Sequence, residues 1–182
     1  MTQPQQATED HPLSFAPAHD QAQFYAVLTD LLSAICSSTA WEYGESWIPH
    51  GTVLEVSPAW CLSTTLDSQR AVAWTQFQMC SKAFILRPGE GMPGRVWQTQ
   101  QPVWITDTSA QSEAYFLRNQ IARAFGVKAG LGIPLLAKAE VVAVIAVFMS
   151  EAKPEDQTLI DQTQAAIANF RNLEQIATGI LL

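Results

Sequence analysis

The stretch from Phe84 to Asp107, FILRPGEGMPGRVWQTQQPVWITD, constrains the fold more than any other part of the chain. Its first half holds three glycines and two prolines. Glycine allows backbone angles that other residues rarely adopt, and proline fixes φ and removes a hydrogen-bond donor. A short helix is expected next, and Pro102 then returns the chain to an extended run, Val103–Ile105. The stretch therefore predicts a structured loop and a brief helix between two strands.

The glycine spacing in this loop also matches the G-x-G-x-x-G motif of dinucleotide-binding proteins. Gly89, Gly91 and Gly94 supply the motif, and Asp107 lies near the offset of a ribose-binding acid. A dinucleotide-binding turn opens a long crossover helix, but only seven residues separate the last glycine from the next proline. Pro93 cannot offer an N–H to a pyrophosphate. The sequence therefore disfavours nucleotide binding.

The order of motifs along most of the chain resembles the GAF domain family of small sensory modules. GEGMPGRVW, QPVWITD, a helix, GVKAGLGIPLL and a valine-rich strand follow the family order over roughly residues 24–175. WEYGESWIP and the later SPAW are most similar to GAF domains of bacterial, especially cyanobacterial, signalling proteins. The resemblance implies an α+β fold related to PAS domains. In that fold an antiparallel β-sheet lies between a terminal helix pair and a layer of loops and helices.

One domain is predicted behind an N-terminal tail. Residues 1–18 are rich in Gln, Pro, Thr and Ala and show no hydrophobic periodicity, which predicts a disordered tail before a single domain over 19–182. Hydrophobic periodicity then predicts helices and hairpins. The helices are expected from Asp20, over 67–82, over 109–124 and over 154–182, and the hairpins over 41–60 and 128–149.

Two of these helices have predicted boundaries or partners. Ser112 and Gly126 are expected to cap the 109–124 helix, and Pro154 is expected at the first position of the last helix. The last helix can serve a dimer or signalling role, because its apolar stripe fits two arrangements: a dimer seam with the N-terminal helix, or packing of both helices on the sheet. The stripe comprises Leu159, Thr163, Ala166, Phe170, Leu173, Ala177 and Ile180.

Composition narrows the classes of partner and compartment. Ten basic against seventeen acidic side chains give a net charge of −7, which argues against nucleic-acid binding. Without a long apolar run or an apolar leader, neither a membrane span nor secretion is expected, and a cytoplasmic location is predicted. Three cysteines without a C-x-x-C pair predict neither a disulfide framework nor a metal site. Cys36 is expected in the core, while a redox or chromophore role for Cys36, Cys61 or Cys80 stays open.

The resemblance places a ligand cavity between the sheet and the layer formed by residues 67–82 and 109–125. Arg118 in that layer has two interpretations: it clamps a carboxylate or phosphate beside aromatic rings, or it lies on the surface with its stem over apolar residues. Glu42 and Glu45 are expected as charges at a sheet edge. The candidate ligand-binding residues are Phe77, Phe84, Trp97, Tyr115, Phe116 and Arg118.

Specialised GAF proteins carry marker residues that this chain lacks. Free methionine sulfoxide reductases have cysteines where this chain has Met92-Pro93 and GVKAG, and bilin-binding members have one near the helix that here reads SEAYFLRNQIARAF. No catalytic residue is therefore nominated, and the cofactor stays undefined. The expected function is non-catalytic sensing or regulation by an unknown small molecule. Output would pass through the terminal helices to a partner protein or a dimer mate. The alternative is an interaction module whose pocket is filled by aromatic side chains.

Overall fold

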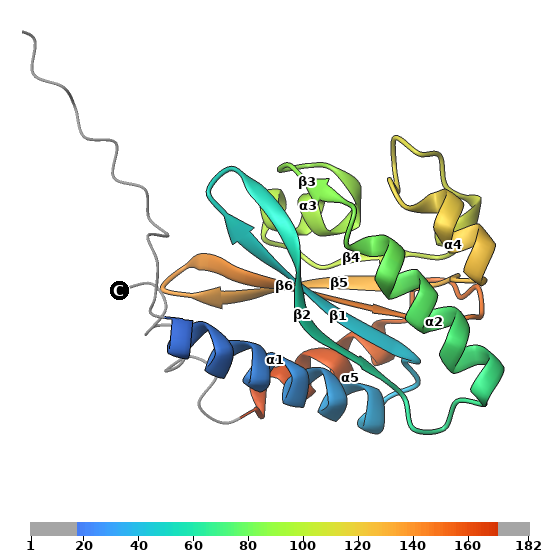
Figure 1. Ribbon diagram of the computed structural model, residues 1–182, viewed down its shortest axis with the longest axis horizontal. Coiled ribbons are helices and arrows are strands. Elements are labelled where there is room, and N and C mark those ends of the chain that lie inside the picture. The colour runs from blue at the N-terminus through green and yellow to red at the C-terminus, as the bar shows by residue number, and fades with distance from the viewer. Residues whose placement is uncertain (1–17, 171–182) are drawn as a thin grey trace, which may run out of the picture.

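The computed structural model describes residues 18–170, and its centre is a six-stranded sheet in which all neighbouring strands are antiparallel (Figure 1). The near-continuous apolar run predicted as a central strand is β6, beside β1 in the middle of the sheet. Such a run suits a strand that is covered on both faces. In sheet order the strands are β3 (Ile85–Leu86), β2 (Val53–Leu62), β1 (Tyr43–His50), β6 (Glu140–Phe148), β5 (Gly130–Ala137) and β4 (Val103–Ile105).

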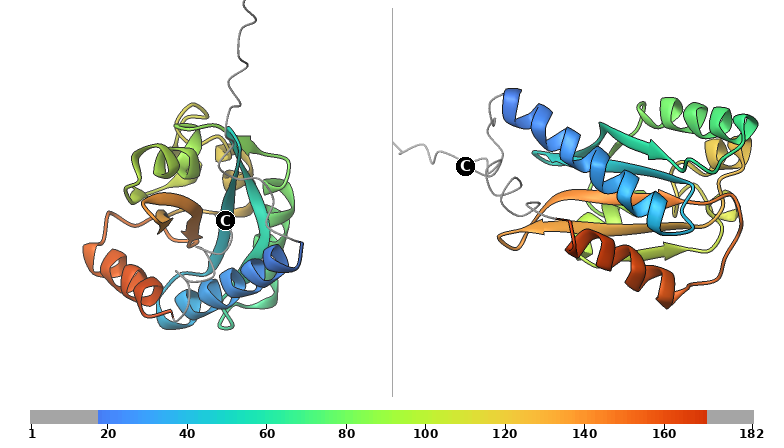
Figure 2. Two further views of the ribbon diagram at one scale, coloured as in Figure 1. Left: turned by 90° about the vertical axis from the view of Figure 1, so that its left-hand side faces the viewer. Right: turned by 90° about the horizontal axis from the view of Figure 1, so that it is seen from below.

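Helices cover the two faces of the sheet separately (Figures 1 and 2). Two terminal helices, α1 (Ala18–Ser38) and α5 (Gln157–Ala168), pack on one face. The other face is covered by α2 (Ser68–Ser81), α3 (Gly91–Thr99) and α4 (Asn119–Phe125). The predicted α+β sandwich is confirmed. Within residues 18–170, no helix combines the length and hydrophobicity needed to cross a membrane.

The glycine-rich loop closes a turn and does not form a dinucleotide site. The Gly89 N–H donates to the Gly94 carbonyl over 2.8 Å, and a Cβ at Gly94 would collide with the Arg87 carbonyl oxygen. Only the nine-residue α3 follows this turn. The strands on either side of it, β3 and β4, lie at opposite edges of the sheet. The dinucleotide fold is therefore absent, as the short helix had indicated.

The helix predicted over 109–124 was wrong in its first half. The chain forms a single 3-10 turn, η1 (Thr108–Ala110), and becomes helical again only at α4. The Asp107 carboxylate accepts the N–H groups of Ser109 and Ala110, and Gln111 then adopts an extended conformation that ends the turn. Ser112 begins a non-helical turn and caps no helix. Gly126, with φ of +71°, does end α4 as predicted.

The terminal helices also differ from the predicted boundaries. α1 begins at Ala18, two residues early, and α5 begins at Gln157 and not at Pro154. The later start has a local cause, because the Asp156 carboxylate accepts the Leu159 N–H over 3.1 Å and so serves as the N-cap. Residues 1–17 and 171–182, and with them most of the predicted tail and the end of the apolar stripe, lie outside the described residues.

Candidate functional site

A carboxylate lies inside the core on the face covered by α2, α3 and α4. Side chains of a strand alternate between its faces, so Tyr43, Glu45 and Trp47 of β1 all point toward this layer. Glu45 is completely buried, and β1 is a central strand. The expectation that Glu45 is a charge at a sheet edge was therefore wrong. Burying a charge is costly unless it is paired and hydrogen-bonded, so its partners define the site.

Two hydrogen-bond donors and one cation surround the Glu45 carboxylate. The Tyr43 hydroxyl donates to Oε2 over 2.7 Å, and the Trp47 indole N–H donates to Oε1 over 2.9 Å. Arg118 Nη2 lies 2.7 Å from the same Oε1. Burial and the adjacent carboxylate raise the pKa of Tyr43 well above its ordinary value, so the phenol remains a proton donor. Neighbouring strand residues thus hold the carboxylate, and a distant residue supplies its counter-charge.

The counter-charge is Arg118, which immediately precedes α4 and is only 2% exposed. The interpretation of Arg118 as a surface residue was therefore wrong. Its Nη1 donates to Ser81 Oγ over 2.7 Å, and that hydroxyl donates to the Phe77 carbonyl. Aromatic rings enclose the guanidinium, which favours a cation through their quadrupoles. Its carbon lies 4.9 to 5.4 Å from the ring centres of Phe77, Trp47, Phe116 and Phe148.

Replacing both charges of such a pair and removing only one of them have very different costs in free energy. Removing two charges from water costs about as much as their attraction returns, so an apolar replacement of both is often neutral or stabilising. Removing one partner, by contrast, costs about 3–5 kcal/mol because the other charge stays buried and unpaired. The Glu45–Arg118 pair therefore adds little to the stability of the fold. If one of its two charges leaves, another charge of the same sign is strongly favoured in its place.

The structure brings three of the six predicted ligand-binding residues together. Phe77, Phe116 and Arg118 are buried, and both rings lie against the Arg118 guanidinium. Trp97 of α3 and Phe84 are half-buried at the margin of the same apolar cluster. Phe84 also lines a separate groove of about 390 Å³ beside β2 and β3. Tyr115 lies elsewhere and is 42% exposed, with its ring 3.8 Å from the Arg95 guanidinium carbon.

Sequence reasoning missed the residues that hold Arg118 in place: Tyr43, Glu45, Trp47 and Ser81. The signal for the first three was present in WEYGESW, because the period of two puts the glutamate on the same face as both aromatic residues. An acidic residue flanked at i−2 and i+2 by core aromatics is itself a candidate for burial.

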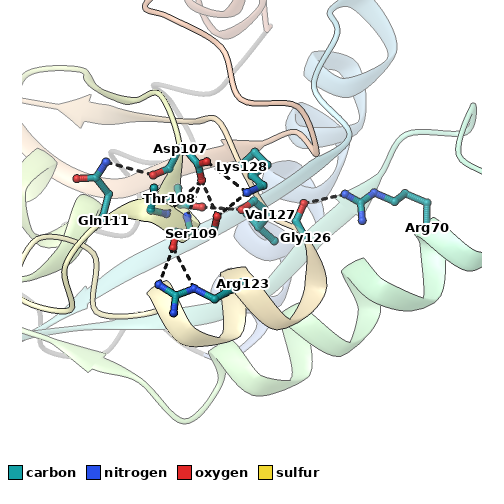
Figure 3. A network of polar contacts seen from close by, with 10 residues as sticks. Arg70, Asp107, Thr108, Ser109, Gln111, Arg123, Gly126, Val127 and Lys128 are labelled. Atoms are coloured by element: carbon teal, nitrogen blue, oxygen red, sulfur yellow. Dashed lines mark hydrogen bonds and ion pairs between the residues drawn. The ribbon is translucent and has the colours of Figure 1, made fainter.

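A second polar network fixes the chain just before α4 (Figure 3). Asp107 lies 3.3 Å from Lys128 Nζ, and the same ammonium donates to Ser109 Oγ over 2.7 Å. Arg123 of α4 donates to the Ser109 carbonyl. Burial alone would raise the pKa of Asp107, but hydrogen bonds from Ser109 and Lys128 outweigh it and lower the pKa. The network holds both η1 and α4 against the sheet.

The far end of α4 is fixed by α2. Arg70 donates to the carbonyls of Phe125 and Gly126 over 3.1 and 2.8 Å, satisfying acceptors that a helix C-terminus leaves free. An open groove of about 610 Å³ lies between these two helices; Arg70 and Arg123 line it, and Arg118 does not. Residues 111–118, which lead to the buried arginine, contain neither helix nor strand. This segment is the wall of the site that has no regular secondary structure.

Solved structures of GAF domains share this architecture. The GAF domain/HD domain protein from Geobacter sulfurreducens has a TM-score of 0.61 at 11% identity, over 86% of this chain and 91% of that one. The NreA protein from Staphylococcus aureus, mutated in its nitrate-binding site, has a TM-score of 0.54 at 16% identity, over 78% and 94%. Free methionine-R-sulfoxide reductase from Neisseria meningitidis, in complex with its substrate, has 0.51 at 14%, over 93% and 97%. At these identities the likeness shows the fold alone.

Family membership rests on the sequence as well. A search of curated proteins gave no match. Residues 21–170 match the family described as GAF domain, which is most of the chain and nearly all of the described part. The β-sheet order, the terminal helix pair and the glycine-rich turn agree with that match. The chain belongs to the GAF domain family.

Proposed function

We propose that this GAF domain is a non-catalytic sensory module that binds a small anionic molecule between the sheet and the α2/α4 layer. Arg118 binds the anion, and Glu45 is the internal counter-ion that occupies the guanidinium in the absence of ligand. The observation that carries this proposal is the Arg118–Glu45 contact of 2.7 Å, with Arg118 2% exposed. A guanidinium recognises carboxylates and phosphates through paired N–H donors.

Exchange of one anion for another preserves the charge balance of the core. When a ligand takes the place of Glu45 at Arg118, Tyr43 and Trp47 continue to donate to the displaced carboxylate. Glu45 then keeps two of its three partners. The ligand enters on the side of residues 111–118, since that wall has no helix or strand to unfold. The nitrate-binding site of NreA supports the view that this fold accommodates small anions.

The signal passes from β1 to the terminal helices. Glu45 faces the ligand layer, whereas its neighbour Gly44 lies against Leu32 and Cys36 of α1, so a shift of β1 is felt on both faces. A ligand biases such a shift only through different affinities for the two states. The helices then act on a partner protein or a second copy of the chain in the cytoplasm. No nucleic acid or membrane enters this mechanism.

Catalysis is left out of the proposal because the thiols lie in the wrong places. Cys36 and Cys61 belong to the core under α1, on the face opposite Arg118, and Cys80 is exposed on α2. Reduction of a sulfoxide by thiols needs an attacking and a resolving cysteine at the substrate. Incubation with free methionine sulfoxide and a thiol reductant should give no turnover. Turnover above the rate of the reductant alone would contradict this assignment.

Thermal unfolding against a panel of small anions tests the binding proposal. An anion that binds the native state raises the melting temperature by mass action. Glu45→Gln should bind the same anion roughly tenfold or more tightly, because a hydrogen bond to a charged group contributes about 1.5–3 kcal/mol and the competitor is gone. Glu45→Leu with Arg118→Met, which keeps the core neutral, should abolish the response.

Arg123→Met is the matched control. Arg123 lies in the same layer but is exposed and donates only to a backbone carbonyl. This variant should respond to the anion as the unmodified protein does. Equal binding by the Glu45→Leu/Arg118→Met variant would remove Arg118 from the site and refute the proposal.

A second candidate function is an interaction module without a ligand. The packing of aromatic rings favours it, because Tyr43 stacks on Trp74 at 5.2 Å and Phe77 meets Phe148 at 5.7 Å, which fills the layer. Val72 and Met79 on α2 are 57% and 63% exposed and offer a contact surface. No response to any anion in Glu45→Gln, together with loss of a captured partner on Val72→Ser, would favour this function.

A further inference from the structure

Two thiols from separate elements meet under α1. Cys36 lies in the last turns of α1 and Cys61 near the end of β2, 25 residues later. Their sulfur atoms are 3.3 Å apart, and both are free thiols. They are 3% and 8% exposed. The expectation of a small core cysteine is met for Cys36, but it did not include a second thiol in contact.

Gly44 lies beside this pair, opposite Cys61 in the β1–β2 register. A Cβ at Gly44 would approach Leu32 Cδ2 to 3.0 Å and Cys36 Sγ to 3.6 Å. The first distance is tight and the second is ordinary contact, so α1 packs closely on the sheet at the point where the two thiols meet.

The environments of the two thiols differ in a way that assigns their roles. The contact with Cys36, together with hydrogen bonds from the Gly44 backbone and Ser33, lowers the pKa of Cys61 against the effect of burial. The hydrogen bond with Cys61, together with burial, raises the pKa of Cys36. Cys61 is also the more exposed of the two thiols, at 8% against 3%. Both differences favour Cys61 as the attacking thiol and Cys36 as the resolving thiol.

We propose that Cys36 and Cys61 are a redox-active dithiol, which a small hydroperoxide converts into a disulfide between α1 and β2. The Cys61 thiolate attacks one peroxide oxygen, the O–O bond breaks, and protonation of the leaving oxygen releases water or an alcohol. Cys36 then attacks the resulting sulfenic acid and expels its oxygen as water. The dithiol loses two electrons and two protons in total, and the peroxide gains them.

Other uses of the pair are less well supported. Within residues 18–170, no group of three or more His, Cys, Asp or Glu side chains is arranged to bind a metal. The pair lies on the face of the sheet opposite Arg118, so the reaction does not depend on the proposed anion site. Its product would join the first terminal helix covalently to the sheet. The oxidised domain thus holds α1 in one position, whatever the ligand state.

Peroxide titration of the full-length chain tests the proposal, with Cys80→Ser used to remove the exposed thiol. Stoichiometric hydrogen peroxide should remove both remaining thiols and lower the intact mass by two hydrogen atoms. A peptide pair linked through Cys36 and Cys61 should appear, and dithiothreitol should restore both thiols. Retention of both thiols at a dose that oxidises Cys80 in the unmodified chain would overturn the proposal. Addition of oxygen atoms without the cross-link would overturn it equally.

Single-cysteine variants test the order of the two steps. With Cys36→Ser and Cys80→Ser combined, Cys61 should form a sulfenic acid that a 1,3-dione reagent traps. With Cys61→Ser and Cys80→Ser combined, trapping at Cys36 should be at least roughly tenfold slower, since the thiolate is the reacting form. Faster trapping at Cys36 would reverse the assigned roles. The mass measurement above does not depend on these variants.

Discussion

The two faces of the central sheet are packed in different ways. Under α1 and α5 the core is mainly aliphatic, and its polar contacts join neutral groups, such as Trp41 with Thr163. Under α2, α3 and α4 the core is aromatic and contains the Glu45–Arg118 ion pair. Apolar burial is the main source of stability in proteins. Both faces therefore stabilise the fold through apolar burial, but only the second keeps an ion pair in its core, and that pair adds little net stability.

Breaking the ion pair should have the largest effect on stability. Arg118→Met leaves the Glu45 carboxylate buried without a counter-charge, and should lower the free energy of unfolding by about 3–5 kcal/mol. Glu45→Leu with Arg118→Met should recover part of this loss, because no charge remains buried although Tyr43 and Trp47 lose their acceptor. Urea unfolding of the two single variants and the double variant gives the coupling energy. If either single variant were as stable as the unmodified protein, the two charges would not be buried as described.

Truncation on the opposite face should be nearly as destabilising, for a different reason. Leu31 of α1 is fully buried, and Leu31→Ala should cost about 3 kcal/mol through lost burial and a residual cavity. The affinity for the anion should fall far less than on loss of Arg118, because Leu31 packs on the α1/α5 face and does not touch the anion site. Urea unfolding gives the first quantity and calorimetric titration at a temperature where the variant is folded gives the second. A loss of affinity in a folded Leu31→Ala variant as large as that on loss of Arg118 would contradict the assignment of the anion site to the opposite face.

Two tryptophans allow a matched comparison of the faces. The indole of Trp47 donates to a carboxylate, and the indole of Trp41 donates to the Thr163 hydroxyl over 2.9 Å. The hydrogen-bond part of the loss should be about 1.5–3 kcal/mol for Trp47→Phe and about 1 kcal/mol for Trp41→Phe. Both indoles are buried, so the loss of volume is similar. Equal costs in chemical denaturation would contradict the difference between the faces.

The smallest effect should come from the loop that supports the ligand layer. The pKa of Asp107 is lowered in the folded protein, so its stabilising contribution is present above the unfolded pKa of about 3.9. That contribution is lost as the pH falls through the folded value. Asp107→Asn should therefore destabilise the protein at pH 6, by less than about 1 kcal/mol for so accessible a pair. Urea unfolding of both proteins from pH 6 to pH 3 should show the difference shrink.

The fold was predictable because local signals agree with the global arrangement. The apolar run of β6 and the glycine-rich turn each specify their own structure within a few residues. The 109–124 helix was wrong because its spacing of apolar residues is helical, while the chain leaves the helical conformation at Gln111 and resumes it only at Asn119. The Asn119 side chain donates to the Gln111 carbonyl across this irregular segment, and such side-chain hydrogen bonds leave little trace in hydrophobic periodicity.

The candidate site was less predictable, because its charges are far apart in the sequence. Glu45 and Arg118 are separated by 73 positions (118 − 45), and each alone fits an exposed position. Only the strand order shows that β1 is central and that Arg118 reaches it. Cys36 and Cys61 present the same difficulty on a smaller scale, since a 25-residue separation gives no sign of contact.

Indole N–H resonances report directly on whether an anion displaces Glu45. In a nitrogen-15 spectrum of the labelled protein, titration with a binding anion should shift the Trp47 signal, since its acceptor is the carboxylate that moves. The Trp41 signal should shift less, because its acceptor is Thr163 of α5, which feels only the movement transmitted through β1. A saturable shift of Trp47 that is clearly larger than that of Trp41 is the predicted result. Binding that moves Trp41 and leaves Trp47 unchanged would contradict displacement of Glu45 from Arg118.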